Sequence, residues 1–435
     1  MNIIDSKGAI ILIISERFPR YTAYDPLVPV WCLTPNSKGS FHRFFDTSPV
    51  SPSGRYVAVL QMPQEERLPQ PGEQAVIALI DLHTGTERPI AATCGWEPQL
   101  GANLNWGTSD EKLYYNDVEP GEWEPYCVEL NPLTGAKRRL EGGIYRISPD
   151  GKSIISACMK RMRRTQYGYG VMVPDDRVPR NFGFSEDDGL YVTDTETGKR
   201  RLLVSIKEVF DRAQPAIDRQ LYAHGECYGF HCKFNPQGDR LIFTMRWFHT
   251  EEEQPWNMLM KHNLKFWVIT MKPDGSDIHV AVGPEQWDKG GHHINWYPDG
   301  RTLSMNLCLD GDRKLKLVRA GYDGSGLSTI IEGIPGSGHP TVHPNGRHIL
   351  TDAYEQEHVA YGDGTVPLRL IDLKGGSERA IIRIPVGNPG TKTTSALRVD
   401  PHPAWAPDNR HVIFNGFVDG TRRVFLADLG GVIRE

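Results

Sequence analysis

The chain has 435 residues, enough for one large β domain or for two to three ordinary domains, so length alone does not fix the domain number. Its 44 glycines, 32 prolines, 10 tryptophans and 16 tyrosines are typical of a turn-rich, aromatic-rich, all-β protein. The formal net charge of −5, without a long basic run, argues against a protein built to coat nucleic acid or an anionic membrane.

The first apolar segment and the cysteines bear on the cellular compartment. Residues 8–15, GAIILIIS, are too few to span a membrane and lack the cleavage site of a secretory signal, so they predict a strand. The seven cysteines are odd in number and form no CxxC pair, which indicates neither a disulfide framework nor a thiolate zinc site. These features predict a cytoplasmic protein with no nucleic-acid or membrane partner, and the sequence does not indicate its oligomeric state.

A hairpin pattern recurs seven times between residues 47 and 415. Each copy has a short apolar strand, a tight turn and a second strand of β-branched and apolar residues, as in IYRISPDGKSIISA and HINWYPDGRTLSMN. The residues that anchor the turns are Pro52, Thr108, Pro149, Pro236, Pro298, Pro344 and Pro407. Most copies are followed by a third strand, such as LKFWVITM, and another turn. The repeat predicts a seven-bladed β-propeller that forms a single domain over residues 1–435.

The spacing of the anchors predicts an insertion and the closure of the ring. The intervals are 56, 41, 87, 62, 46 and 63 residues, whereas a blade needs about 40 to 50. The longest interval predicts an irregular insertion around residues 156–225 that passes over one face and can cover the site. The last copy ends close to residue 435, so its outermost strand is expected from residues 8–14 or 28–33, which removes the exposed sheet edges.

Four of the seven copies carry histidine at the same offset. The residues five positions before the anchors are Thr47, Asn103, Ile144, His231, His293, His339 and His402. The first strand of each blade lines the central channel, so these histidines are expected to converge. A single histidine there is usually a half-exposed residue with a satisfied hydrogen bond. Four in register favour a site, because neutral imidazole is a common metal ligand and a proton acceptor near neutral pH.

Residues near the end of the second strand should border the same ring, because this strand returns to the end where the first began. This places Arg246, Asn306 and Tyr354 near the histidines as candidates for the site. The guanidinium of Arg246 suits bidentate capture of a carboxylate, although a surface arginine without a partner is an equally simple interpretation. A basic cluster can draw in an acidic ligand or can be a solvated charge run; it comprises Lys160, Arg161, Arg163 and Arg164.

The C-terminal half, roughly residues 225–430, resembles oligogalacturonate lyase, a seven-bladed propeller family of bacterial pectin catabolism. The clearest similarity is DPHPAWAPDNRHVIFNGFVDGTRRVFLADL, which corresponds to the final blade of the family with its His-Pro-His-Pro run, aromatic residue, turn and hairpin. HINWYPDG, GFHCKFNP with LKFWVITMKPDGS, and SGHPTVHPNG fall in corresponding places. The N-terminal half matches only as generic blades.

The resemblance implies a lyase that cleaves short uronate oligosaccharides by β-elimination, with a divalent metal, typically manganese, held by channel histidines and one glutamine. His293 and His402 match metal ligands of the family. Asp400 stands where the first histidine of the His-Pro-His run is expected, and Leu397 where the glutamine is expected. An aspartate can bind a hard divalent ion but a leucine cannot. His339 or His292 is therefore expected to complete the ligand set.

The expected substrate is a small acidic oligosaccharide, and the expected base is a histidine. β-Elimination beside a carboxylate removes a weakly acidic C5 proton, and a metal or an arginine stabilises the enolate-like transition state. The resemblance and the ring position assign the base to His231, with His224 as the reserve, and Arg161, Arg164, Asn306 and Tyr354 are expected to bind substrate.

Other propeller functions remain open from the sequence. The first alternative is a non-catalytic module that binds a protein or a saccharide, since fold does not fix function. Such a module has no reason to hold a metal in its channel. A lactonase-like hydrolase normally uses acidic and amide metal ligands, which the histidines disfavour. A propeller peptidase is not indicated, because the chain has no appended α/β-hydrolase region and no GxSxG motif.

Overall fold

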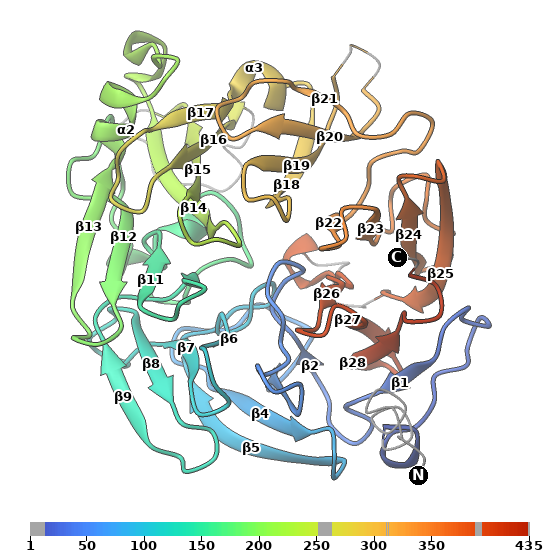
Figure 1. Ribbon diagram of the computed structural model, residues 1–435. Helices are drawn as coiled ribbons and strands as arrows, with labels where there is room; N and C mark the ends of the chain where they lie inside the picture. The colour runs from blue at the N-terminus through green and yellow to red at the C-terminus, as the bar shows by residue number, and fades with distance from the viewer. Residues whose placement is uncertain (1–13, 251–262, 310, 312, 388–393, 434–435) are drawn as a thin grey trace.

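Seven small antiparallel sheets surround a central axis in the computed structural model (Figure 1). The structure describes residues 14–250, 263–309, 311, 313–387 and 394–433. Each sheet has four strands that follow one another in space, and the sheets follow one another around the ring. This arrangement confirms the all-β, seven-bladed propeller that the hairpin repeat predicts.

The blades are numbered here in chain order. Blade 1 contains β2 (Ser40–Phe41), β3 (Tyr56–Gln61), β4 (Ala75–Asp81) and β5 (Thr86–Thr93). Blade 2 contains β6 (Asn105–Trp106), β7 (Leu113–Asp117), β8 (Tyr126–Leu130) and β9 (Lys137–Leu140). Blade 3 contains β10 (Arg146–Ile147), β11 (Ser153–Ser156), β12 (Gly189–Asp194) and β13 (Arg200–Ser205). Blade 4 contains β14 (Glu226–Phe234), β15 (Leu241–Phe248), β16 (Lys265–Met271) and β17 (His279–Val282). Blade 5 contains β18 (Gly291–Trp296), β19 (Thr302–Leu307), β20 (Lys316–Gly321) and β21 (Ser328–Thr329). Blade 6 contains β22 (Thr341–Val342), β23 (His348–Thr351), β24 (Thr365–Asp372) and β25 (Ser377–Pro385). Blade 7 contains β26 (Ala404–Trp405), β27 (His411–Val418), β28 (Thr421–Asp428) and β1 (Val30–Cys32).

The last blade is completed by a strand from near the start of the chain. β1 pairs antiparallel with β28, and Val30 lies opposite Ala427. The ring is therefore closed from within residues 28–33, one of the two segments expected from the sequence. Of the other segment, residues 8–13 lie outside the described residues. Residues 14–17 form a helical turn rather than a strand.

The connection between the first two strands of each blade carries the predicted turn. Between β18 and β19 the turn YPDG ends at Gly300, whose φ is +66°. A Cβ at this position would lie 1.7 Å from Oε1 of Gln237, in the equivalent turn of blade 4. Glycine is favoured there by the left-handed backbone, and a larger residue would also have to displace the side chain of Gln237.

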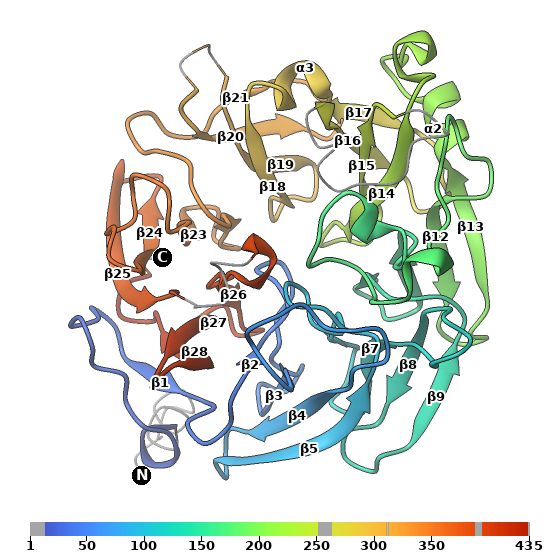
Figure 2. The ribbon, with the colours of Figure 1, turned by 180° about the vertical axis from the view of Figure 1, so that it is seen from behind.

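The region around 156–225, expected to be an irregular insertion, is only partly irregular. It contains β12 and β13, the two outer strands of blade 3. Its short helices are η1 (Met162–Arg164), η2 (Asp175–Arg177), α2 (Ile206–Arg212) and η3 (Arg219–Tyr222). The segment between β11 and β12, drawn in green, lies over the ring near its centre (Figure 2). Two further helices are α3 (Pro284–Trp287) and η6 (Ser395–Leu397).

The channel is filled by the segment that follows β2. Phe44 and Phe45 are each 1% exposed and belong to the largest cluster of buried apolar residues. Phe44 contacts the rings of four histidines from four blades. The aromatic side chains therefore form a packed floor at the centre of the ring, on which the histidines lie.

Two expectations about the chain concern membranes and disulfides. Within the described residues, no helix has the length and apolar character needed to cross a bilayer. The seven cysteines are all free thiols.

Candidate functional site

The histidines at the shared offset converge on the channel. His231 lies on β14 and His293 on β18, while His339 and His402 lie just before β22 and β26. The ring centroids of His293 and His339 are 3.8 Å apart, and those of His339 and His402 are 4.3 Å apart. His231 lies across Phe44, which stacks on it at 5.4 Å and contacts His402 at 4.7 Å. Three histidines thus form one cluster, and the fourth faces it over an aromatic ring.

The first strands place these side chains by an unusual backbone. His293 and His402 have φ values of +61° and +48°, in the left-handed region that residues with a side chain rarely adopt. Such conformations store strain and are concentrated at functional sites. The imidazoles at both positions contact Phe44, which fills the channel.

His339, Asp400 and His402 form a candidate metal centre. One ligand atom from each lies within 4.8 Å of the others, and all three residues are buried. Nε2 of His339 and Nε2 of His402 are buried without a hydrogen-bond partner. Buried polar groups are normally satisfied, so two unpaired nitrogens beside a carboxylate fit a bound cation. Imidazole and carboxylate together suit divalent ions such as Mn²⁺, Fe²⁺ and Zn²⁺.

Asp352 fixes the tautomer of His339. Its carboxylate accepts hydrogen bonds from Nδ1 of His339 at 2.8 Å and from the backbone N–H groups of His339 and His402 at 2.7 and 3.0 Å. Because Nδ1 carries the hydrogen, the lone pair of His339 is on Nε2, toward Asp400. A carboxylate behind a histidine is the usual support of a metal-binding imidazole.

His293 is oriented by a second set of contacts, and here the two adjacent histidines have different roles. The amide of Asn306 donates to the carbonyl of Gly338 at 2.9 Å and to Nδ1 of His292 at 3.3 Å, so this nitrogen of His292 is an acceptor. Nδ1 of His293 lies 2.7 Å from both the same carbonyl and the same nitrogen and therefore donates. Its lone pair is thus on Nε2, 3.1 Å from the hydroxyl of Tyr354. His292 thus supports His293. The group of ligand atoms that converge within 4.8 Å comprises His339, Asp400 and His402, so the role of His293 as a metal ligand stays a prediction.

Asp400 has a cationic neighbour on its other side. Nε of Arg398 donates to its carboxylate at 2.7 Å, and Nη2 of the same arginine donates to the hydroxyl of Tyr169 at 3.3 Å. Nε2 of His402 is 3.7 Å from the Asp400 carboxylate. Leu397, at the position of the family's glutamine, is fully buried and offers no side-chain ligand.

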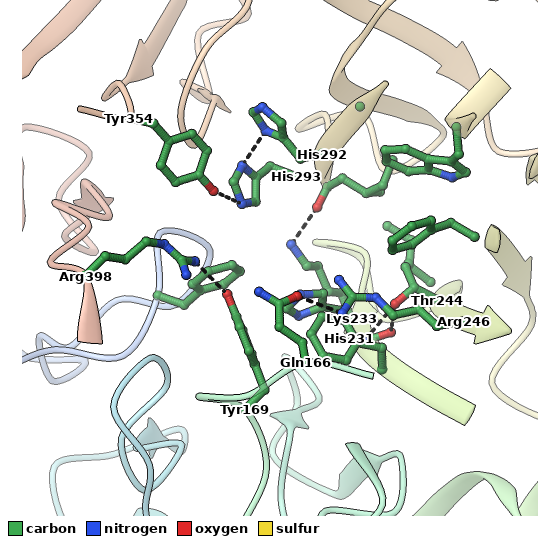
Figure 3. A pocket seen from close by; sticks show the side chains of 17 residues that line it. Gln166, Tyr169, His231, Lys233, Thr244, Arg246, His292, His293, Tyr354 and Arg398 are labelled. Atoms are coloured by element: carbon green, nitrogen blue, oxygen red, sulfur yellow. Dashed lines mark hydrogen bonds between the residues drawn. The ribbon is translucent and has the colours of Figure 1, made fainter. Parts of the chain in front are cut away.

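A cavity of about 250 Å³ opens beside this cluster (Figure 3). The residues that line it include three cationic side chains and no carboxylate; they are Phe44, Gln166, Tyr169, Phe230, His231, Lys233, Ile242, Thr244, Arg246, Phe266, Trp287, Gly291, His292, His293, Ile294, Tyr354 and Arg398. Two of these cations are paired with carboxylates behind the lining, Lys233 with Asp46 and Arg398 with Asp400. Arg246 has no such partner among the described residues, so a half-apolar cavity with this one unpaired cation suits a small anionic ligand.

His231 is held in this cavity as a neutral imidazole. Burial lowers its pKa well below the usual value, and the nearby charges of Lys233 and Arg246 lower it further. Its backbone N–H donates to Oγ1 of Thr244 at 2.7 Å, and its Nδ1 is hydrogen-bonded to the hydroxyl of Tyr145. When Nδ1 carries the hydrogen, Nε2 is free to accept a proton.

Arg246 lies between two aromatic rings and beside Gln166. Its guanidinium carbon is 3.4 Å from the ring centroid of Phe230 and 4.8 Å from that of Phe266. Nη1 donates to Oε1 of Gln166 at 2.7 Å. Burial lowers its pKa to about 9, and no ion pair with a carboxylate forms in the described part of the chain. A ligand carboxylate bound to Arg246 would supply the negative partner that this buried guanidinium lacks.

The other predicted residues lie outside this cavity. His224 is exposed and precedes β14. Arg161 pairs with Asp188 at 3.3 Å, and Arg164 is buried and hydrogen-bonded to the carbonyl of Val178. Asn306 is fully buried under the histidines. For Arg164 the structure differs from a solvated charge run, because backbone carbonyls of the segment between β11 and β12 bind it. The roles predicted for these four residues stay predictions.

Several residues of the site were not identified from the sequence. Lys233 lies two positions after His231 on β14, a spacing that puts both side chains on one face of a strand, and this signal could have found it. Its Nζ donates to the carbonyl of Ile294 at 2.6 Å and pairs with Asp46 at 2.7 Å. Gln166 and Tyr169 reach the cavity from the segment between β11 and β12, which the sequence predicts only as an irregular insertion that can cover the site.

Comparison with solved structures agrees with the fold. An oligogalacturonate lyase in complex with manganese is similar over 95% of this chain and 96% of its own, with a TM-score of 0.60 and 15% identity. An oligogalacturonate lyase from Vibrio parahaemolyticus is similar over 94% of this chain and 96% of its own, with a TM-score of 0.61 and 15% identity. A prolyl endopeptidase covers 99% of this chain with 51% of its own, at a TM-score of 0.51 and 10% identity.

These similarities define the class of structure. The resemblance to oligogalacturonate lyases, seen in the sequence over residues 225–430, extends in three dimensions to nearly the whole chain. Identities of 15% show a shared fold and no more. No protein-family model and no curated protein matches the sequence.

Proposed function

We propose that this protein is a lyase that cleaves short uronate-containing saccharides by metal-assisted β-elimination. The observation that carries the proposal is the cavity itself: a neutral histidine and three cationic side chains line it without a carboxylate, and a cluster of histidines with Asp400 adjoins it. The manganese complex of a similarly folded lyase supports the choice of Mn²⁺.

Two residues of the cavity would carry out different parts of the reaction, substrate binding by Arg246 and proton abstraction by His231. Arg246 would bind the uronate carboxylate, which lies next to the C5 carbon that loses its proton. Nε2 of His231 would accept this proton, the C5–H electrons would form the C4–C5 double bond, and the C4–oxygen bond would break as its oxygen takes up a proton from water. A substrate carboxylate beside Arg246 offsets the charge of this arginine, which makes His231 more basic when substrate is bound.

The metal would be held by His339, His402 and Asp400, whose ligand atoms lie within 4.8 Å of one another, and His293 would join them if its Nε2 exchanged the hydroxyl of Tyr354 for the ion. When bound, a divalent ion supplies positive charge that stabilises the enolate-like transition state. Asp352 and Asn306 keep the imidazoles in the tautomers that bind it. Tyr354, at the edge of the cavity, would bind a sugar hydroxyl.

The test is cleavage of pectic, alginate and glycosaminoglycan fragments with and without Mn²⁺, followed by the ultraviolet absorbance of the unsaturated product. We expect His231→Ala to lower kcat by about 100-fold or more. His224→Ala, which removes an exposed histidine seven residues away, is the matched control and should leave kcat unchanged. No product from any fragment, or equal rates for His231→Ala and the unmodified protein, would favour a non-catalytic binding module instead.

A further inference from the structure

A cluster of charged side chains lies in the channel, next to blades 1 to 3. At the offset where blades 4 to 7 carry histidine, blades 1 and 2 carry Thr47 and Asn103. The charged residues beside these two positions, which we call the channel cluster, are Arg43, Asp46, Arg146 and Lys233. The cluster therefore contains three cations and one carboxylate.

The single acid of the channel cluster is already paired. Oδ2 of Asp46 is 2.7 Å from Nζ of Lys233, and Oδ1 accepts a hydrogen bond from Oγ1 of Thr47 at 2.9 Å. Nη1 of Arg43 lies 4.0 Å from Oδ1, at the limit of an ion pair. Arg146 forms no ion pair with any carboxylate in the described part of the chain. One carboxylate therefore cannot offset the charges of both guanidinium groups as well as that of Lys233.

The guanidinium groups of Arg43 and Arg146 approach each other closely. Nη1 of each donates a hydrogen bond to the same oxygen, Oγ1 of Thr47, which is neutral and supplies no charge between them. Burial lowers the pKa of Arg146, and the nearby charge of Arg43 lowers it further. A charge that is buried without a counter-charge is costly, so an anion beside the two arginines would relieve their repulsion.

Two hydrogen-bond donors of the same region have no acceptor. Nη2 of Arg43 and Nδ2 of Asn103 are buried and form no hydrogen bond within the described residues. The two groups are adjacent, because Nε of Arg43 donates to Oδ1 of Asn103 at 2.7 Å. Arg43 is 3% exposed and Asn103 is fully buried, and polar groups at such depth are normally satisfied. Free N–H donors beside uncompensated positive charge are the surroundings that an anion prefers.

We propose that Arg43, Arg146 and Asn103 bind one small monovalent anion, chloride. Both guanidinium groups reach a single hydroxyl oxygen, so the gap between them suits a monatomic ion rather than an organic acid. The three ligands come from the segment after β2, from β10 and from the loop before β6, so the ion would link the first three blades. The site shares no residue with the candidate metal centre and would exist whether or not the protein is a lyase.

The first test is a crystal structure of the unmodified protein grown in bromide, whose anomalous scattering identifies a halide. We expect an anomalous peak within hydrogen-bond distance of Nη2 of Arg43 and Nδ2 of Asn103. Electron density of a water molecule without anomalous signal at this position would overturn the proposal.

The second test measures Tm in about 200 mM sodium chloride and in sodium gluconate of the same concentration, whose anion is too large for the site. A ligand that binds only the folded state stabilises it, so Tm should be at least about 2 °C higher in chloride. Asn103→Asp places a carboxylate beside Arg43 and should abolish this difference. The matched control is Asn409→Asp, because Asn409 has a left-handed φ of +56°, close to the +53° of Asn103, but lies exposed in a turn.

The control should retain the full difference between the two salts. Equal Tm of the unmodified protein in chloride and gluconate, or a difference that persists in Asn103→Asp, would exclude a chloride site. If Asn103→Asp does not fold, the bromide map and the Tm difference of the unmodified protein decide.

Discussion

The carboxylate of Asp352 accepts a hydrogen bond from Nδ1 of His339 at 2.8 Å while it also binds the backbone N–H of His402. One fully buried acid therefore orients two members of the candidate metal centre from two neighbouring blades. Because both ligands depend on it, a change at Asp352 should affect metal binding more than a change at a single contact of the cavity wall.

Asp352→Asn is predicted to weaken Mn²⁺ binding. The amide can still accept a backbone N–H, but it is neutral and no longer favours the tautomer of His339 with a free Nε2. Substitutions of such supporting residues typically reduce metal affinity about 10- to 100-fold. Isothermal titration with Mn²⁺ measures this, with Asp363→Asn as the control at an exposed acid that pairs with Arg383. Equal affinity in Asp352→Asn and the unmodified protein would rule out the assigned role.

Arg246→Lys is predicted to raise KM about tenfold with a smaller change in kcat. A lysine keeps the positive charge but presents a single ammonium, so it loses the planar stack between Phe230 and Phe266 and the bidentate grip on a carboxylate. Steady-state kinetics on digalacturonate measures both constants. Arg161→Lys is the control, since Arg161 pairs with Asp188 outside the cavity. An unchanged KM would show that Arg246 does not bind the substrate carboxylate.

Tyr145→Phe is predicted to lower kcat about tenfold, because it removes the buried hydrogen bond that orients His231. Leaving one partner of a buried hydrogen bond unsatisfied costs roughly 1–3 kcal/mol. Without the phenol oxygen, Nδ1 of His231 has no fixed partner, and the fraction of molecules with a free Nε2 lone pair falls. KM should stay within about twofold. A kcat equal to that of the unmodified protein would contradict the proposed orientation of the base.

Acidification is predicted to destabilise the metal-free protein, and His42 should account for a measurable part. Burial lowers the pKa of His42 to about 3, while the unfolded chain titrates near 6.5. Below pH 6.5 the unfolded state takes up a proton that the folded state does not, so stability falls as the pH falls. For one histidine, the free energy of unfolding should decrease by about 2 kcal/mol between pH 7 and pH 5.

Urea unfolding at several pH values measures this slope. His42→Phe should unfold with a shallower pH dependence whatever its overall stability, because one proton-binding group is gone. The exposed His224 serves as the control position, since His224→Ala should leave the slope unchanged. A slope in His42→Phe as steep as that of the unmodified protein would disprove the assignment.

The local features of the fold were predictable from the sequence. The turn after His293, for example, is encoded by Pro298, Asp299 and Gly300, which act within a few residues of each other. Once the turns were aligned, the offset of the four histidines followed from the register of the first strands. The convergence of their rings is therefore a consequence of repetition.

The residues that support the site depend on distant contacts. Phe44 separates His231 from the other histidines because the chain after β2 crosses the channel, and no local pattern indicates this path. Asp352 follows a strand of blade 6 and resembles any other loop acid. Gln166 acquires its role only where an irregular segment meets Arg246 from another blade. Contacts between residues of different blades depend on how the blades pack across the ring, which no local sequence pattern shows.

The pairing of β1 with β28 has a consequence for the order of assembly during synthesis. Asp400 and His402 belong to the blade whose outer strand is residues 30–32, so this blade is complete only when two segments separated by nearly four hundred residues have met. A ribosome synthesises the second of these segments nearly four hundred residues after the first. The cation-binding cluster therefore matures only after both segments have left the ribosome and paired, and a metal bound to it would stabilise the closed ring.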